Sequence, residues 1–204
     1  MIELLFSQYK DYSLFFIFLE ITAVTFGIIS VLFARKNNIL VYPTGLVSTI
    51  LYVYILFEWK LFGDFIINIY YSIMSVLGWY LWSRKKNGEE KFPISIMSRK
   101  DYVISILIFI LTLIFIVLVY HFFDKFTHWT AYVDTLTTAL FFVGMWLMAK
   151  RKIENWIIWI IADIISVPLY FYKGLTFSSL QFLLFTIFAI LGFIEWKRNL
   201  QTQT

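Results

Sequence analysis

The segment LIFILTLIFIVLVY, residues 107–120, decides the fold class of this chain. Its apolar residues cover every face of a helix, so a helix here would have no polar side to turn toward water. A membrane strand would instead show about ten residues of alternating polarity, and this segment does not. The segment therefore predicts a helix that spans a membrane and argues against a closed barrel.

Six further apolar stretches have the length that a membrane helix needs, which is about 17 to 25 residues. The composition agrees, because 61% of the 204 residues are hydrophobic and only 15% are charged. We expect an all-α membrane protein that forms one domain, 1–204, in the lipid bilayer. Its seven transmembrane helices are predicted at 14–34, 39–57, 62–82, 102–120, 131–149, 156–173 and 176–195.

The basic residues indicate the orientation of the chain. Of its 17 Lys and Arg residues, all but Lys10, Lys60, Lys125 and Lys173 lie in the connections after the first, third and fifth spans or at the C-terminus. Cytoplasmic loops are enriched in Lys and Arg, so we expect the N-terminus to lie outside and the C-terminus to lie in the cytoplasm. The net charge of +4 then reflects topology, and no nucleic-acid partner is expected. The first thirteen residues lack the basic start and cleavage site of a removable signal peptide, so the first span is expected to remain.

Two groups of three spans contain the same types of residue at similar spacings. The matches are Gly27 with Gly144, Asn38 with Asn155, the Tyr-x-Tyr motifs at 52–54 and 170–172, and Gly78 with Gly192. We predict a 3+1+3 arrangement, in which two three-helix repeats, 14–83 and 131–196, are joined by a linker helix at 102–120. Because a single span separates the repeats, both cross the membrane in the same direction, as parallel repeats do in some transporters.

The segment NWIIWIIAD, residues 155–163, is the strongest candidate for a functional site. Trp156, Trp159 and Asp163 follow i, i+3, i+7 spacing and therefore share one face of a helix. An ionisable group at membrane depth is a functional candidate by default. The centres of the spans contain no Lys or Arg, so an ionised Asp163 would lack a counter-ion and a cationic or hydrogen-bonding ligand would relieve it. The indoles favour a flat ring, and a cationic ring would gain up to about 2 kcal/mol from cation–π attraction.

Other polar residues fall at similar depth in the membrane. Asn68 and Tyr71 are spaced i, i+3 in the third span and lie near the bilayer midplane, where transporters bind substrates between repeats. Glu20, Thr138 and Gln181 complete the set of candidate binding residues. Each of these side chains could instead cross-link helices, a contact that contributes about 0.6 kcal/mol in lipid.

Enzymatic function is not indicated by the sequence. The chain has no cysteine, which excludes thiolate metal sites and cysteine nucleophiles, and no paired carboxylate motif for acid–base catalysis. His121 and His128 are interpreted as solvated loop residues and not as metal ligands. We expect neither a cofactor nor a metal. A non-transporting membrane scaffold or a channel stays open as another class, and a lack of saturable uptake would distinguish it.

These motifs resemble those of the PnuC family of bacterial vitamin transporters. WIIWIIAD, 156–163, resembles the family's tryptophan motif ending in Asn or Asp, and NIYY, 68–71, resembles its Asn-x-x-Tyr motif. The sequence around DTLTTA, 134–139, and LYFYKGL, 169–175, is also similar, so the resemblance covers nearly the whole chain.

The resemblance implies a multi-pass protein of the bacterial inner membrane, with a fold related to the sugar-transporting SWEET proteins and a homotrimeric assembly. It also implies uptake of nicotinamide riboside by facilitated diffusion, with trapping by a cytoplasmic kinase. Trp156 and Trp159 would stack on or gate the ring, while Asp163, Asn68 and Tyr71 would bind the ribose or the ring substituent. Related members carry thiamine, riboflavin or deoxynucleosides. Nicotinamide riboside and thiamine both contain a cationic ring, so the residues alone leave thiamine open.

Overall fold

The computed structural model describes residues 13–58, 62–86, 89–90, 92–122, 128–173 and 176–202. Lys10, Lys60, Lys91 and Lys125, which entered the charge count above, lie outside these residues, as does the start of the chain. The elements in the described part are the helices α2 (Leu14–Arg35), α3 (Val41–Glu58), α4 (Phe62–Ser83), α5 (Arg99–Phe122), α6 (Thr130–Ala149), α7 (Glu154–Tyr172) and α8 (Thr176–Thr202), and the strands β1 (Lys85–Lys86) and β2 (Glu89–Glu90).

All seven helices are long and apolar enough to cross a membrane. The seven predicted spans are confirmed as helices, with boundaries that differ from the prediction by a few residues. The largest difference is at the end of α8, which continues to Thr202 because the backbone stays helical after the apolar residues end. The prediction of an all-helical membrane protein therefore holds.

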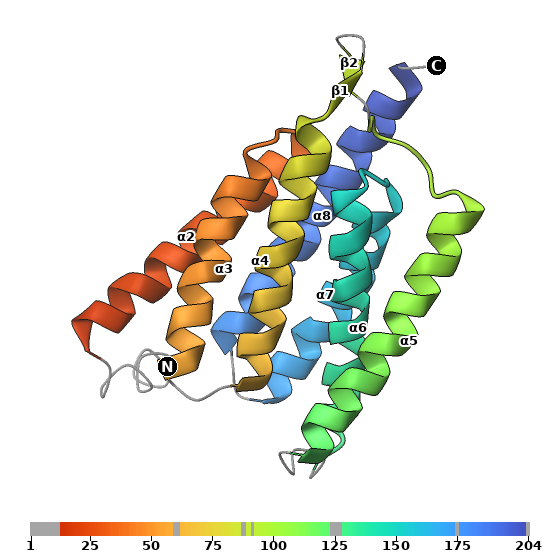
Figure 1. Ribbon diagram of the computed structural model, residues 1–204. Coiled ribbons are helices and arrows are strands. Elements are labelled where there is room, and N and C mark those ends of the chain that lie inside the picture. The colour runs from red at the N-terminus through yellow and green to blue at the C-terminus, as the bar shows by residue number, and fades with distance from the viewer. Residues whose placement is uncertain are drawn as a thin grey trace.

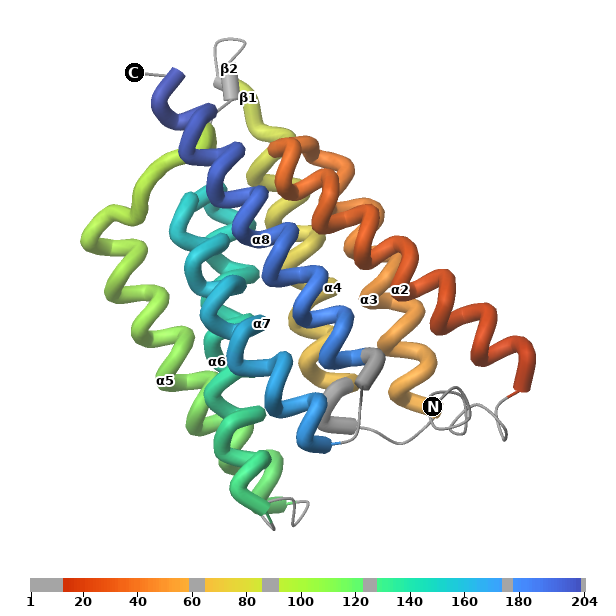
Figure 2. Tube along the Cα trace, turned by 180° about the vertical axis from the view of Figure 1, so that it is seen from behind, coloured from red at the N-terminus to blue at the C-terminus, as the bar shows by residue number. Residues whose placement is uncertain are grey.

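Six of the helices pack in a closed series, and α5 lies outside it (Figure 1). α3 packs between α2 and α4, and α7 packs between α6 and α8. These two groups meet twice, where α2 contacts α8 and where α4 contacts α6. The first of these contacts is visible from behind (Figure 2). α5 packs against α6 and leaves most of its apolar surface exposed, as expected for a surface that faces lipid.

The ends of α2 and α6 have the same backbone structure. Asn37 and Arg151 are the non-glycine residues with positive φ in the described chain, at 51° and 50°. The N–H of Asn37 donates to the Ala34 carbonyl and that of Arg151 to the Met148 carbonyl, both at 2.9 Å. Asn adopts this conformation readily, whereas Arg151 is held there by its side chain, which donates to the Phe92 carbonyl and stacks on Trp82.

One end of the bundle carries most of the described basic residues and is called the basic end below. It contains the ends of α2, α4, α6 and α8 and the starts of α3, α5 and α7. The largest buried side chains gather there, namely Tyr42, Trp82, Trp156 and Trp196, each at most 4% exposed. Their rings are in contact, with Tyr42 edge-on to Trp82 and Trp156 edge-on to Trp196. The core of the molecule therefore lies near the basic end.

The connection between α4 and α5 contains two features. β1 and β2 form an antiparallel pair. Beyond them, Ser95 pairs with the turn between α6 and α7, accepting from the N–H of Ile153 and donating to the Arg151 carbonyl. This connection is therefore attached to the basic end of the bundle.

Candidate binding site

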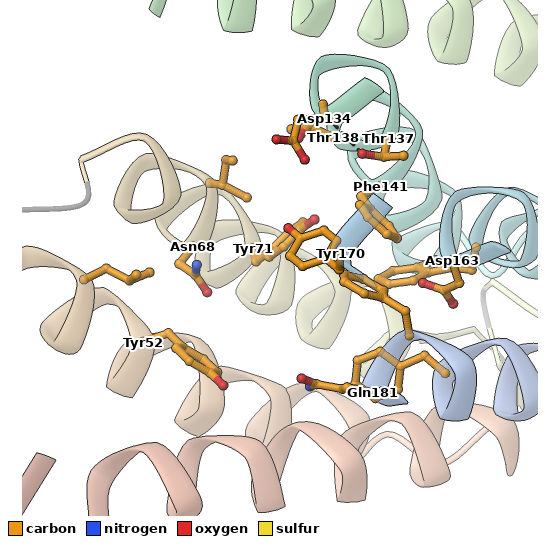
Figure 3. A pocket seen from close by; sticks show the side chains of 15 residues that line it. Tyr52, Asn68, Tyr71, Asp134, Thr137, Thr138, Phe141, Asp163, Tyr170 and Gln181 are labelled. Carbon is orange, nitrogen blue, oxygen red and sulfur yellow. Dashed lines mark hydrogen bonds between the residues drawn. The ribbon is translucent and has the colours of Figure 1, made fainter. Parts of the chain in front are cut away.

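A cavity of about 350 Å³ lies between α3, α4, α6, α7 and α8, and is called the first cavity below (Figure 3). Six of the residues predicted for the binding site line it together. These are Asn68 and Tyr71 from α4, Thr138 from α6, Trp159 and Asp163 from α7, and Gln181 from α8. Four helices therefore bring residues that are far apart in the sequence to one cavity.

Asp163 is the carboxyl group of this cavity that has no partner within the described residues. Its side chain is 1% exposed, and neither carboxylate oxygen has a hydrogen-bond partner within the described residues. No Lys or Arg is among the residues that line the cavity. Burying a charge without a partner is strongly unfavourable, so this position suits a ligand that supplies a positive charge or hydrogen-bond donors.

A second carboxylate, Asp134, lines the same cavity but is neutralised. Lys173, which follows α7, donates to the carboxylate of Asp134 near the start of α6. The ammonium group also lies 5.1 Å from the centre of the Tyr170 ring. The two acids of the cavity therefore differ, because Asp134 has a basic partner and Asp163 has none within the described residues.

Aromatic rings form one wall of the first cavity. Trp159 contacts Phe141 with ring centres 5.5 Å apart, Phe141 stacks on Phe182 at 5.9 Å, and Phe182 contacts Tyr170 at 4.8 Å. The indole N–H of Trp159 has no partner within the described residues. A flat ring bound here would meet both aromatic faces and an available hydrogen-bond donor.

Trp159 is positioned by a glycine on the neighbouring helix. A Cβ atom at Gly144 would lie 2.7 Å from Nε1 of Trp159 and 3.0 Å from its Cδ1. Any side chain at this position of α6 would therefore push the indole away. The visible role of Gly144 is therefore to make room for Trp159.

Two predicted site residues lie elsewhere. Trp156 belongs to the core at the basic end, and its indole packs on Trp196 and over Gly192. It lines neither this cavity nor the one described next, because three helical positions rotate it by about 60° from Trp159 and it lies about one turn closer to the helix start. Glu20 is half-buried on α2 and also lines neither cavity.

The cavity also contains residues that sequence reasoning did not assign to it. Tyr52 and Tyr170 were noted only as markers of the repeat, and Figure 3 shows Gln181 pointing from α8 toward Tyr52. Tyr170 could have been found, because it lies seven positions after Asp163 and so shares its helix face. Phe141 and Phe182 could not, because nothing in the sequence separates them from the other 21 phenylalanines.

A second cavity, of about 220 Å³, adjoins the first. Both cavities are lined by Tyr52, Asn68, Tyr71, Trp159, Gln181 and Phe185. The remaining walls come mainly from α2 and α3 and reach the core at the basic end, where Ala34, Tyr42 and Met148 close the cavity. Within the described residues neither cavity contains a group of His, Asp and Glu that could hold a metal ion.

Comparison with known proteins agrees with the resemblance seen in the motifs. Residues 17–198 match the family described as nicotinamide mononucleotide transporter. The chain is 24% identical to the nicotinamide riboside transporter PnuC of Escherichia coli, over 87% of this chain and 84% of that protein. It is 22% identical to the riboflavin/roseoflavin transporter RibM of Streptomyces davaonensis, over 60% and 58%. The crystal structure of the vitamin B3 transporter PnuC superimposes with a TM-score of 0.69 at 21% identity, covering 98% of this chain and 86% of that one.

Proposed function

Because the chain belongs to the nicotinamide mononucleotide transporter family, we propose that it carries nicotinamide riboside into the cell through the first cavity. Membership makes it a multi-pass membrane transporter for a vitamin and not an enzyme. The identity of the vitamin is the proposed part. The E. coli relative is named as a transporter of nicotinamide riboside, and the chemistry of the cavity suits that compound.

The observation that carries this proposal is the pairing of Asp163 with the aromatic wall. Nicotinamide riboside contains a pyridinium ring, which is flat and positively charged. Placed against Trp159, this ring would gain cation–π attraction, and Asp163 would receive the counter-charge that the described protein does not supply. Asn68, Tyr71, Thr138 and Gln181 offer hydrogen-bonding groups for the ribose and the carboxamide. Trp156 has a supporting role in the core and does not stack on the ring.

Two other vitamins of this family are the alternatives. Thiamine also has a cationic ring and would use the same acid and indole. Riboflavin, whose transporter is among the relatives, is neutral, so it would leave Asp163 without a counter-charge. The charge of the cavity therefore favours the two cationic vitamins, and the E. coli relative favours nicotinamide riboside.

Transport in this proposal is facilitated diffusion by alternating access, with phosphorylation in the cytoplasm retaining the product. The two groups α2–α4 and α6–α8 would rock about the first cavity. The basic end would lie on the cytoplasmic side of the membrane. The functional unit would be a homotrimer with one path in each subunit. The SWEET-like arrangement stays a prediction.

Support for two repeats comes from contacts that occur in pairs. α2 contacts α8 and α4 contacts α6, which is the pattern that exchange of the two groups would produce. The positive-φ residues Asn37 and Arg151 end equivalent helices. The separation in sequence between Asn37 and Arg151 is the same as that between Tyr42 and Trp156 and that between Trp82 and Trp196. In this alignment of the two repeats Gly27 is no longer equivalent to Gly144, and Gly45 is equivalent to Trp159.

Uptake by proteoliposomes tests the proposal. Purified protein is reconstituted, and uptake of radiolabelled nicotinamide riboside, thiamine and riboflavin is compared with that of protein-free vesicles. We expect saturable uptake of nicotinamide riboside that stops at equal concentrations inside and outside and is competed by the unlabelled compound. Saturable uptake of thiamine or riboflavin alone would replace the proposed substrate, and no saturable uptake of any of them would contradict it.

A further inference from the structure

We propose that the second cavity is a release chamber, through which the substrate leaves the first cavity toward the basic end, and that Trp82 and Trp196 close its exit. This inference rests on the proposed function, since it assigns the cavity that the same substrate would occupy next. It concerns residues outside the predicted binding set.

The two cavities share a set of lining residues, past which a ligand could move from the first cavity into the second. Asn68, Tyr71, Trp159 and Gln181 line both cavities, with Asp163 on the side of the first and Ser75 on the side of the second. A substrate that moved past these shared side chains would leave Asp163 behind without leaving the protein. The second cavity therefore continues the first one toward the basic end.

The second cavity is suited to release because it offers no counter-charge to a cationic substrate. No Asp, Glu, Lys or Arg is among its lining residues. Two of its hydroxyls are turned to the backbone, since Ser30 donates to the Val41 carbonyl at 2.7 Å and Ser48 to the Ala23 carbonyl at 2.8 Å. A cationic ring that enters this chamber loses its counter-charge, so it is held less tightly there than beside Asp163.

The exit of the chamber is closed by a pair of matching contacts. Trp82 on α4 donates its indole N–H to the Met148 carbonyl on α6 at 3.3 Å, and Trp196 on α8 donates to the Ala34 carbonyl on α2 at 3.0 Å. Ala34 and Met148 themselves line the chamber. These bonds bridge the two places where the helix groups α2–α4 and α6–α8 meet, so the groups cannot separate at this end while both bonds persist.

Neighbouring side chains reinforce the closure. The rings of Trp82 and Trp196 lie 5.9 Å apart, so the two bonds meet at one aromatic contact. Tyr42 donates its hydroxyl to the same Met148 carbonyl, and Arg35 forms an ion pair with Glu195 at 2.8 Å beside Trp196. Opening toward the basic end therefore requires the loss of both indole bonds at once.

Thiol labelling tests this inference, and the absence of cysteine from the chain removes any background. Ser75, which lines the chamber and is 2% exposed, is replaced by cysteine as a reporter. The reporter is combined with Trp82→Phe and Trp196→Phe, which keep an aromatic ring but remove the N–H donors. A cationic, membrane-impermeant methanethiosulfonate is applied to each face of sealed vesicles. Trp79→Phe is the matched control, since Trp79 is 42% exposed on the same helix as Trp82.

We expect the double variant to raise the labelling rate of the Ser75→Cys reporter about tenfold or more from the side of the basic end. The Trp79→Phe control should leave that rate unchanged. A second reporter, Thr138→Cys, lies in the first cavity. Its labelling rate from the side of the basic end should be no higher in the Trp79→Phe control than in the background without Trp79→Phe. Acceleration only from the opposite side, or no acceleration in a folded double variant, would overturn the inference.

Each single variant carries the same test should the double variant fail to fold, with a smaller increase expected from the loss of one bond. Labelling requires no substrate, so its outcome is separate from the identity of the vitamin. Failure of nicotinamide riboside to enter proteoliposomes would remove the proposed substrate, whereas unchanged labelling of Ser75→Cys would remove the release chamber.

Discussion

Asp163 occupies the most unfavourable position of any carboxylate in the described part of the ligand-free protein. It is almost fully buried, its oxygens have no hydrogen-bond partner, and no basic residue is among its cavity's lining residues. Such a group costs several kcal/mol of stability unless a ligand offsets the cost. Asp134, in the same cavity, differs from Asp163 because it forms an ion pair with Lys173.

Replacement of Asp163 by Asn should therefore stabilise the ligand-free protein. Asn has nearly the same shape without the charge, so we expect a gain of about 1 kcal/mol or more, which raises the Tm in detergent by about 2 to 4 °C for each kcal/mol. The further rise in Tm that nicotinamide riboside gives the unmodified protein should be lost. Asp134→Asn is the matched control and should lower the Tm, because it leaves Lys173 without its partner. A lower Tm for Asp163→Asn would contradict this explanation.

Gly144→Ala should weaken substrate binding without unfolding the protein. The added Cβ would lie 2.7 Å from Nε1 of Trp159, so the indole must move away from its place in the cavity wall. We expect the Kd for nicotinamide riboside to rise about tenfold or more by calorimetry. Gly27→Ala serves as the control, because its Cβ would meet only the hydroxyl of Ser48, at 3.1 Å. Equal effects of the two variants would show that Trp159 is not the cause.

At the scale of elements, the spans were predictable because a membrane helix must be apolar over a fixed length. The stretch 107–120 lies well inside α5, and the remaining spans also fall on helices. The attachment of the α4–α5 connection was not predictable, because Ser95 pairs through its backbone with the turn after α6 and backbone pairing leaves no pattern in the side chains.

The attachment of α5 to this turn depends on Lys152. Its ammonium group forms an ion pair with Asp101 at 3.2 Å and donates to Ser95 and to the Ile96 carbonyl. Lys152→Met should lower the free energy of unfolding by about 1 to 3 kcal/mol, measured as a lower Tm, since Asp101 is left buried without this partner. The Kd for nicotinamide riboside should stay unchanged. Lys36→Met, at an exposed position after α2, should alter neither quantity, and a similar loss in that control would argue against a specific role of Lys152.

At the scale of the whole molecule, the sequence indicated which polar residues gather in one cavity but not the packing around them. Asn68, Asp163 and Gln181 could be predicted because polar groups at membrane depth are rare and need a common environment. Trp156 was placed on the wrong side, since spacing of i, i+3 still allows a helix to turn one residue into the core. The proposed repeat rested on glycine spacing in the sequence, whereas the register proposed for it uses helix ends and ring contacts that only the folded chain displays.

The orientation of the molecule can be checked with single cysteines at its two ends. Leu14→Cys lies at the exposed start of α2, and Thr202→Cys lies at the end of α8. The distribution of Lys and Arg predicts that an impermeant thiol reagent outside intact cells labels the first variant and spares the second. Labelling of Thr202→Cys in intact cells, with Leu14→Cys protected, would reverse the assigned orientation and with it the direction in which the release chamber opens.

The most direct test of the central claim is calorimetric titration with nicotinamide riboside and with its reduced form, whose dihydropyridine ring is neutral but similar in shape. If Asp163 recognises the positive charge, the unmodified protein should bind the oxidised, cationic form about tenfold or more tightly than the reduced form. In the Asp163→Asn variant this preference should disappear. Equal binding of both forms by the unmodified protein, or a preference that persists in Asp163→Asn, would contradict the assignment of this cavity as a site for a cationic vitamin.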